Sequence, residues 1–528
     1  MRPKVWSPPR VPMAFVDYRS GRGMDGDGRR FSPAIKGTRK TPTLNDVLNT
    51  ALLARAEWVM LTGKTPTVQP GGAHWLDAAT EDWGPGTHRR LESGLTGRFT
   101  HKLTGHKLTL THARAWFDED ITAEQARQAF HAVTVFLRTA EPKMDFPMFT
   151  PAATGRMLWG WSVGKDFNPP EIDDFILDRI HATSGQHHME HLVAGDDLND
   201  HGDVVSLIDP KQTPKIPGFV HLDGRFMYAS LARELGVGPA RELGRSAAAD
   251  LLERDPYARA RYLVRFRIPD DWQHIGILGC QHENVRDGWY YPNRPGAAGQ
   301  TWADASEVFV AIRHGWLIEP LEAVQFTKAR PLDVFTSRIL KIRDQVEAAD
   351  VPEGLKDAVL GAFRNIHLHG IGALARRNRV TEHRAASIDD VPTHARSTMI
   401  DHGDHITYED RAPLNDREAS FYHPEISAQV WGRGRARLLD SPAANGHKAG
   451  ALYLPGASII GVEGDAIYTT ALPDWARPAG AGGGDDGKVG RFRLKGALDG
   501  PTSTPDTREA RDRLKKRAAK ALREGSGS

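Results

Sequence analysis

Cysteine is almost absent from this sequence, as are long apolar segments. Cys280 is the single cysteine among 528 residues, which excludes an internal disulfide framework and a zinc site built from four cysteines. No apolar run reaches the roughly 18–20 residues that cross a bilayer. Residues 1–15 carry charge but lack the apolar segment of a secretory signal. We therefore expect a cytoplasmic protein with no membrane partner.

An excess of one charge is also lacking. The chain has 69 Lys and Arg against 67 Asp and Glu, a net charge of +2, so no overall field indicates a nucleic-acid partner. The basic residues instead gather in three segments, at 373–379, 431–437 and 508–524. In the last segment Leu514, Ala518 and Leu522 form a sparse apolar side of a helical wheel. This pattern fits either a solvated surface helix or a helix that follows phosphates.

The hydrophobic periodicity changes several times along the chain and predicts an α+β fold. Helical spacing occurs at 43–61 and 122–140, and again at 332–375 with a break near Pro352, whereas residues 260–279 alternate like strands. A chain of this length is expected to divide into two to four subdomains. Strands lie on both sides of the helical insertion, so a βαβ repeat is not predicted.

Three carboxylates stand out within apolar, strand-like runs. Glu463 and Asp465 flank a glycine in GVEGDAIYTT, and Asp223 ends the apolar part of HLDGRFMYAS. A buried acid is costly unless it is paired or binds a cation. If the two runs are neighbouring strands, the acids converge, and their oxygens suit Mg²⁺, two ions of which promote in-line phosphoryl transfer. The spacing predicts that Glu463 and Asp465 share one face of a strand.

Each of these signals also has a purely structural interpretation. Asp223 could cap a helix after its strand, and residues 463–465 could be the turn of a hairpin. Tyr228 could be a core aromatic residue, and Arg364 and Lys356 could be solvated residues of a helix. From the residues alone, both sets of interpretations stay open.

A different chemistry is indicated by SGQHHMEHL. Here His187, Glu190 and His191 have the spacing of the inverted zinc peptidases. On a helix, His187 and His191 would share one face and could ligate Zn²⁺, leaving Glu190 to activate a water molecule. Short matches of this kind are frequent in a chain with 23 histidines, so a surface histidine cluster is the other interpretation.

The ordered set of motifs across residues 215–500 resembles the family B DNA polymerases, in a divergent form of the protein-primed branch found in phages and plasmids. DGRFMYAS resembles the first palm motif, an Asp followed by Tyr-Pro-Ser, with Ala229 in place of the proline. GVEGDAIYTT resembles Tyr-x-Asp-Thr-Asp, with Glu463 for the first Asp. The segment ending in GAFRNIHLHGIG stands where the fingers carry Lys-x-x-x-Asn-Ser-x-Tyr-Gly. The Ala, Gly, Asp and Arg bias also suggests a phage or mobile element as the source.

This resemblance implies a DNA polymerase-type nucleotidyltransferase. It would transfer a nucleotide from a dNTP to a 3′-hydroxyl of a DNA primer–template, or to the hydroxyl of a protein primer. Asp223 and Asp465 would bind two Mg²⁺ ions, and Glu463 would be a supporting catalytic acid. These roles come from the resemblance and are expectations for the structure to test.

The resemblance also assigns the binding residues. Tyr228 would lie under the sugar of the incoming nucleotide and reject a 2′-hydroxyl. Arg364 or Lys356 would supply a cation to the triphosphate. Contacts to the primer or to DNA would come from Lys495, Arg433 and Arg435.

The implied architecture is a right-hand polymerase with α+β domains. Its expected parts are an N-terminal degenerate exonuclease-like domain at 1–185, palm at 186–330 and 376–475, fingers at 331–375, a flexible linker at 476–490, and a reduced thumb or basic tail at 491–528. Arg19 stands where a proofreading domain has the second acid of Asp-x-Glu, so proofreading is not expected. The fingers motif lacks its lysine and few residues follow Lys495, which leaves a catalytically silent DNA-binding scaffold as the alternative.

Overall fold

The computed structural model describes residues 2–8, 10–32, 42–66, 76, 80–84, 89–91, 94–117, 120–184, 190–192, 201–282, 288–376, 380–411 and 414–525. Within these ranges no helix combines the length and the apolar character needed to cross a membrane. The largest hydrophobic cluster runs from the N-terminal part to the C-terminal part of the chain and includes Trp58, Tyr262, Phe363 and Trp475.

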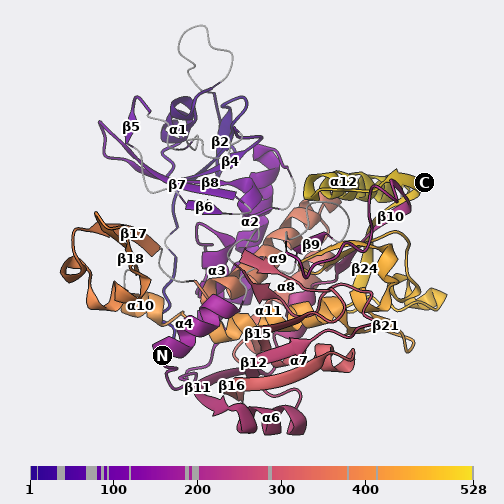
Figure 1. The fold of residues 1–528 in the computed structure, drawn as a ribbon. Helices are drawn as coiled ribbons and strands as arrows, with labels where there is room; N and C mark the ends of the chain where they lie inside the picture. The colour runs from indigo at the N-terminus through magenta and orange to yellow at the C-terminus, as the bar shows by residue number, and fades with distance from the viewer. Residues whose placement is uncertain are drawn as a thin grey trace.

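The N-terminal sheet, at the top of Figure 1, has the strand order β3-β2-β1-β4-β8-β7-β5, with β6 paired to β7. β1, β4 and β8 are parallel, whereas β2 and β3 pair antiparallel. Side chains alternate across a strand, so Val16 packs in the cluster with α1, and Phe15 packs against Phe130 of α2. The elements are β1 (Met13–Asp17), β2 (Gly23–Asp25), β3 (Arg30–Phe31), α1 (Leu44–Leu53), β4 (Trp58–Thr62), β5 (Trp83–Gly84), β6 (Arg89–Leu91), β7 (Gly94–His101), β8 (Lys107–His112) and α2 (Ala123–Ala140).

One of the two N-terminal helix predictions is confirmed and one is wrong in part. Thr122 caps α2 by accepting from the amide of Gln125, whose side chain accepts from the Thr122 amide in return. The helix predicted at 43–61 instead ends at Leu53, because Arg55 takes a left-handed conformation with φ 51°. The fully buried residues that follow form β4 between two parallel strands, where a continuous apolar run is usual.

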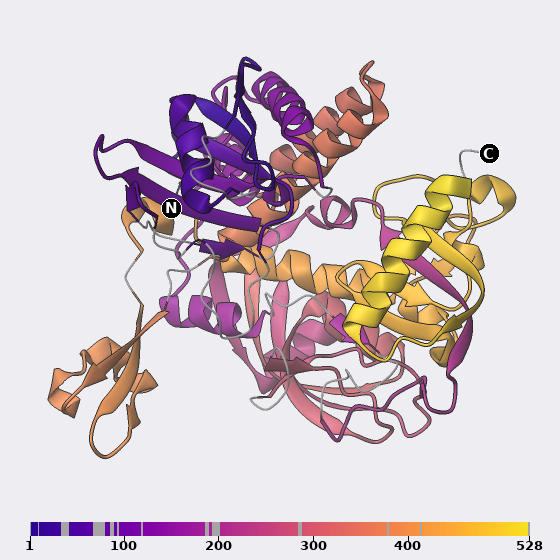
Figure 2. The same cartoon turned by 90° about the horizontal axis from the view of Figure 1, so that it is seen from above.

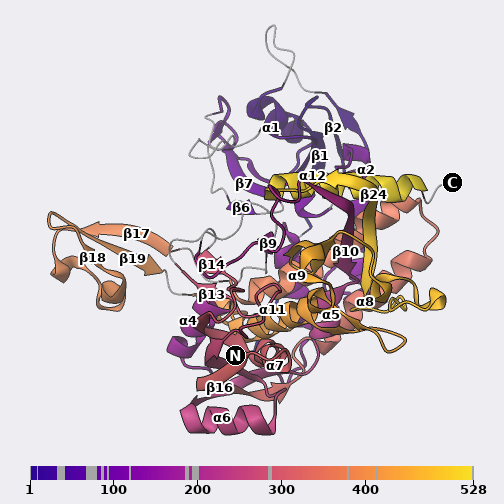
Figure 3. The same ribbon diagram turned by 45° about the vertical axis from the view of Figure 1, so that its right-hand side comes forward.

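A second sheet carries the acids singled out in the sequence. Its order is β24-β10-β23-β22-β9, and all its pairs are antiparallel. A short helix follows β10, and the C-terminal helix α12 lies over β24 (Figures 1 and 3). The elements are β9 (Glu190–Leu192), β10 (Lys215–Gly224), α5 (Met227–Leu231), β22 (Ile459–Glu463), β23 (Ala466–Thr469), β24 (Phe492–Ser503) and α12 (Arg508–Gly525).

A third sheet, at the bottom of Figure 1, has the order β11-β16-β12-β15. The long helix α11 contacts β11 and β15 of this sheet as well as α5 and α9, so it connects the third sheet to the region of the acids. The elements are β11 (Leu235–Gly244), α6 (Arg245–Arg254), β12 (Ala260–Arg267), β15 (Ala298–Asp304), α7 (Ala305–Arg313), β16 (Leu317–Ala329) and α11 (Pro424–Leu439).

Residues 332–375 form the two helices that the sequence predicts, α8 (Asp333–Ala348) and α9 (Glu353–Leu374), with the break at Pro352. Helix α3 (Pro151–Ser162) crosses α9 where Gly155 meets Gly370. A Cβ on Gly155 would lie 2.0 Å from the carbonyl oxygen of Ile366. Only glycine allows so close a crossing, which joins the N-terminal part to α9.

The remaining described elements are short. A sheet of order β17-β19-β18 projects from the body of the molecule, clearly separated in Figure 2. The short elements are α4 (Asp174–Thr183), β13 (Cys280–Gln281), β14 (Trp289–Tyr290), β17 (Val380–Ala385), β18 (Ile400–Asp401), β19 (Ile406–Arg411), α10 (Asp416–Ala419), β20 (Ser441–Pro442) and β21 (Lys448–Ala449).

Residues 476–490, which were expected to be a flexible linker, make specific contacts with other parts of the chain. Arg225 donates to Asp485 at 2.9 Å, and the Asn445 side chain donates to the carbonyl oxygen of Gly483 at 2.9 Å. A Cβ on Gly484 would lie 2.5 Å from the carbonyl oxygen of Trp475. The glycines of this segment therefore permit close backbone approach, a role that composition alone does not distinguish from flexibility.

Candidate active site

Asp223 and Asp465 lie next to each other. Asp223 is near the end of β10, which pairs with β23 in a register that places Asp223 opposite Ala466. The amide of Gly224 donates to the carbonyl oxygen of Asp465 at 3.0 Å. The predicted neighbouring strands are thus present, and they bring together two acids that are 242 positions apart (465 − 223).

The hairpin that carries Asp465 corrects one expectation. Glu463 pairs with Ala466, so Gly464 and Asp465 form the two-residue turn between β22 and β23. Gly464 has φ +59°, a conformation that glycine adopts at little cost. Glu463 and Asp465 therefore do not share a strand face. The turn interpretation describes the backbone correctly, and the turn itself brings Asp465 to Asp223.

The carboxylates of Asp223 and Asp465 repel each other when both are charged. Burial and the neighbouring Asp223 raise the pKa of Asp465 to about 7, although Arg364 and Arg493 oppose the shift. Two cations lie near Asp223: Arg493 is 3.7 Å and Lys495 is 4.0 Å from its Oδ2. A positive charge placed between the two carboxylates would stabilise the charged form of such a buried acid.

The backbone beside the pair leaves room for the acids. A Cβ on Gly224 would lie 3.1 Å from Oδ2 of Asp465 and 2.8 Å from Cβ of Met227. Any side chain at position 224 would therefore push against Asp465 and against the start of α5. Glycine at this position is required by space, since the structure gives it no positive φ.

Glu463 lines the same cleft as this pair, but its carboxylate contacts α12. Its Oε2 accepts from the hydroxyl of Tyr468 and from Lys515 Nζ at 3.0 Å, and Arg511 lies 3.6 Å away. Burial by itself would raise the pKa of Glu463, but Lys515, Tyr468 and Arg511 outweigh it and hold the pKa at about 2. Glu463 is therefore a charged acid whose Oε2 is bound by Tyr468 and by cations of α12, whereas Asp465 is a buried acid beside a second carboxylate.

Tyr228 lies beside the acids in the same cleft. Its side chain is 8% exposed, and its ring packs over Gly434 of α11, where a Cβ would lie 3.2 Å from the ring. Burial and the charge of Asp465 raise the pKa of its hydroxyl. The core-aromatic and site interpretations of Tyr228 both describe this position, because the buried ring forms part of the cleft wall.

The acids open onto a cleft of about 1210 Å³ whose walls are basic. Arg364 of α9 and Lys495 of β24 line it. Four more lining cations, Arg508, Lys515, Lys516 and Arg523, come from the basic segment 508–524 noted in the sequence, whereas Arg225, Arg343 and Arg493 were missed by sequence reasoning. One signal was available: Arg493 and Lys495 are two apart on a strand and so share a face.

Lys356 is placed differently from Arg364. It lies in the first turn of α9, donates to the carbonyl oxygen of Glu347 at 3.2 Å, and has Glu353 at 3.8 Å. It is not among the residues that line the cleft. Of the two cations considered for the triphosphate, Arg364 is the one that faces the acids.

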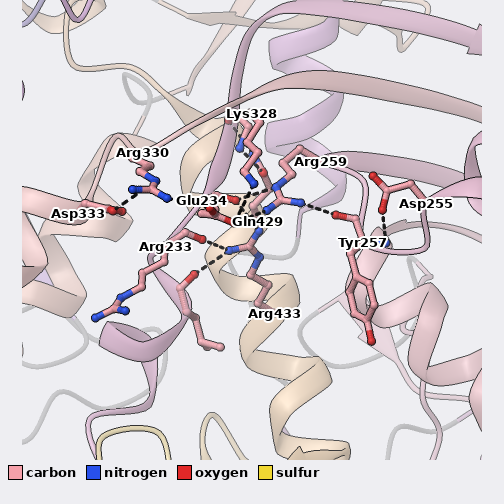
Figure 4. A network of polar contacts seen from close by, with 12 residues as sticks. Arg233, Glu234, Asp255, Tyr257, Arg259, Lys328, Arg330, Asp333, Gln429 and Arg433 are labelled. Atoms are coloured by element: carbon pink, nitrogen blue, oxygen red, sulfur yellow. Dashed lines mark hydrogen bonds and ion pairs between the residues drawn. The ribbon is translucent and has the colours of Figure 1, made fainter.

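Arg433 and Arg435, which were expected to contact DNA, are bonded to other parts of the protein in the structure. Arg433 donates to the carbonyl oxygens of Leu231, Arg233 and Glu234, within the polar network of Figure 4. Arg435 is 8% exposed and forms a bidentate pair with Glu307 at 2.6 and 3.0 Å. These contacts occupy both guanidinium groups, so the proposed DNA contacts come from other cations. A basic run in a sequence does not show which of its residues are buried.

The described part of the zinc-peptidase pattern is a strand and not a helix. His187 lies outside the described residues. Residues 190–192, which include Glu190 and His191, form strand β9 beside β22, so the helical spacing required for a joint zinc site is absent there. Among the described residues, no group of three or more His, Cys, Asp or Glu side chains could hold a metal ion.

No protein-family model matches this sequence, and no curated protein is similar to it. Among solved structures, phi29 DNA polymerase in an orthorhombic crystal form is similar over 93% of this chain and 85% of its own, with a TM-score of 0.52 and 10% identity. A second structure, phi29 DNA polymerase complexed with primer-template DNA and incoming nucleotide substrates, has the same coverage and identity with a TM-score of 0.48. The first likeness shows that this chain has a polymerase-like α+β fold along most of its length.

Proposed function

We propose that this protein is a template-directed nucleotidyltransferase that adds dNTPs to a DNA primer–template. The observation that carries the proposal is the adjacency of Asp223 and Asp465 at the floor of a basic cleft. The polymerase-like fold supports it. The attacking hydroxyl belongs either to a DNA 3′ end or to a protein primer.

The donor set fits Mg²⁺. Asp223 and Asp465 offer two carboxylates, and Mg²⁺ is commonly held by one or two carboxylates together with water and substrate phosphates. The raised pKa of Asp465 next to Asp223 indicates a pair that a divalent cation would stabilise. Two bound Mg²⁺ ions would stabilise the attacking and leaving oxygens of the transferred phosphoryl group.

The chain's own side chains would then bind and orient the substrates. Arg364 and Arg343 project from α9 and α8 into the cleft and would neutralise the triphosphate. The buried ring of Tyr228 would form the surface under the sugar. Lys495, on the strand beside Asp223, would hold the primer terminus near the acids.

We propose no proofreading role for the N-terminal domain. Asp17 ends β1, and its Oδ1 accepts from the amide and hydroxyl of Ser20, both at 2.8 Å. The carboxylate therefore stabilises a turn, and the position two residues later holds Arg19 instead of an acid. A labelled mismatched primer should accordingly keep its 3′ nucleotide in the presence of Mg²⁺.

The proposal is tested by incorporation of labelled dNTPs. Purified protein is incubated with Mg²⁺ and three substrates in parallel: primed DNA, primed RNA, and template without primer. Extension of primed DNA is expected. If the protein binds each substrate but extends none, with or without a protein-primer fraction, the alternative of a catalytically silent DNA-binding scaffold replaces the proposal.

A further inference from the structure

Helix α12 presents three different faces. Toward the second sheet it places Arg511, Leu514 and Ala518, which are 1%, 6% and 0% exposed. Its exposed side includes Arg513, Arg517 and Lys520. The residues that line the catalytic cleft are Arg508, Asp512, Lys515, Lys516, Ala519, Leu522 and Arg523. At 1.5 Å per residue this 18-residue helix is about 27 Å long, so its cleft face forms an extended wall.

The sheet side of α12 is docked by close backbone contact. A Cβ on Gly496 of β24 would lie 2.6 Å from the backbone carbon of Ala518 and 2.6 Å from the amide nitrogen of Ala519. Leu514 and Ala518 join a hydrophobic cluster with Phe219. The helix is therefore part of the folded body, and Leu514 and Ala518 of the apolar side seen in the sequence pack against it, whereas Leu522 lines the cleft.

A polar contact fixes α12 to the catalytic hairpin. Lys515 and Arg511 both reach Oε2 of Glu463, which also accepts from Tyr468. The guanidinium of Arg511 lies over the Tyr468 ring at 4.9 Å. Glu463 begins the turn that carries Asp465. A cation bound at this oxygen of Glu463 would have to displace Lys515.

We infer that Glu463 is a positioning residue that fixes α12 to the hairpin, so that the cleft face of α12 forms a wall that binds the phosphates of a nucleic-acid strand beside Asp465. This inference rests on the proposed function for the identity of the strand. It assigns to Glu463 a contact with α12 in place of a contact with metal. The wall's cations are Arg508, Lys516 and Arg523.

The first test uses Glu463→Gln in the full chain. Hydrogen exchange at the amides of 508–525 is expected to become at least about tenfold faster, and the KM for primer–template is expected to rise while the Mg²⁺ concentration for half-maximal activity stays constant. Gly496→Ala, which displaces α12 sterically, should produce the same faster exchange. Unchanged exchange together with a raised Mg²⁺ requirement would overturn the inference and make Glu463 a metal ligand.

The second test addresses the phosphate wall and needs no catalysis. Binding of a fluorescent primed duplex is measured across a salt series for Lys516→Ala and Arg523→Ala. Each change should lower the slope of log affinity against log salt by about one unit, whereas Arg517→Ala on the exposed side should leave it unchanged. If both cleft variants keep the wild-type slope, the inference that this face of α12 binds phosphates is overturned. Binding without synthesis would leave the wall standing and reject only the proposed activity.

Discussion

Asp223 and Asp465 are held side by side by two antiparallel strands, with the amide after Asp223 bonded to the carbonyl oxygen of Asp465. The relationship depends on backbone geometry at Gly224 and Gly464 as much as on the acids. The closeness of the two acids also affects the charge of the site, because burial and the neighbouring Asp223 together raise the pKa of Asp465 to about 7.

Gly224→Ala is expected to lower the rate of nucleotide addition by about a hundredfold, because the added methyl group would displace Asp465 and Met227 and small displacements of catalytic groups have effects of this size. Single-turnover incorporation measures the rate. Gly354→Ala is the matched control, since a Cβ there meets no atom within 4 Å. Equal rates in the two variants would show that the fit around Asp465 is unimportant.

Arg364→Ala is expected to raise the KM for dNTP by roughly tenfold to a hundredfold, which corresponds to the loss of a charged hydrogen bond. Lys356→Ala, on the same helix, should change it little because Lys356 contacts Glu347 and Glu353. Steady-state kinetics with saturating primer–template distinguishes them. A larger effect at Lys356 would contradict the assignment.

Arg435→Met is expected to destabilise the fold by about 3–5 kcal/mol, because it leaves Glu307 buried without its partner. The double change Arg435→Met with Glu307→Leu should cost less than the single change, since no charge stays unpaired. Denaturant unfolding measures both. If Arg435→Met keeps full stability but loses DNA affinity, the original expectation of a DNA contact is restored.

His367 is expected to make the protein less stable in mild acid. Burial lowers its pKa to about 3, below the unfolded value near 6.5, so the unfolded chain takes up the proton first as pH falls. The stability that the neutral His367 contributes is fully present above about pH 6.5 and is lost as the pH falls toward 3. By pH 5 the loss is about 2 kcal/mol. His367→Phe should remove that much of the stability difference between pH 7 and pH 5.

The control for this pH effect is Phe335→Leu. Phe335 stacks on His367 with ring centroids 5.3 Å apart but has no titrating group, so its loss should lower stability equally at both pH values. Denaturant unfolding at pH 7 and pH 5 provides the comparison. A wild-type pH difference in His367→Phe would contradict the buried neutral imidazole.

The fold class and the convergence of Asp223 and Asp465 could be predicted from the sequence, because both depend on local patterns. Apolar strands that end in Asp223 and surround Asp465 are visible without a structure, and so is the helical insertion at 332–375. What failed depended on burial and on partners distant in sequence. Glu463 was expected from its spacing to share a strand face with Asp465, and only the structure brings Lys515 and Arg511 to it.

The basic residues show the same limit. Arg433 and Arg435 belong to a charge run, but α11 places half-buried Arg433 against the carbonyl oxygen of Glu234 and buries Arg435 against Glu307. Arg343, which faces the cleft, stands in an ordinary mixed-charge helix. Charge along a sequence therefore indicates cations available for binding but not which of them the fold uses internally.

The most direct test of the account is Mg²⁺-dependent dNTP incorporation on primed DNA by Asp465→Asn compared with Asp357→Asn. Both changes remove one carboxylate from the same cleft, but only Asp465 lies beside Asp223. Asp465→Asn is expected to abolish incorporation, whereas Asp357→Asn is expected to retain it. Incorporation by Asp465→Asn at the wild-type rate would contradict the central claim that this pair of acids is the catalytic site.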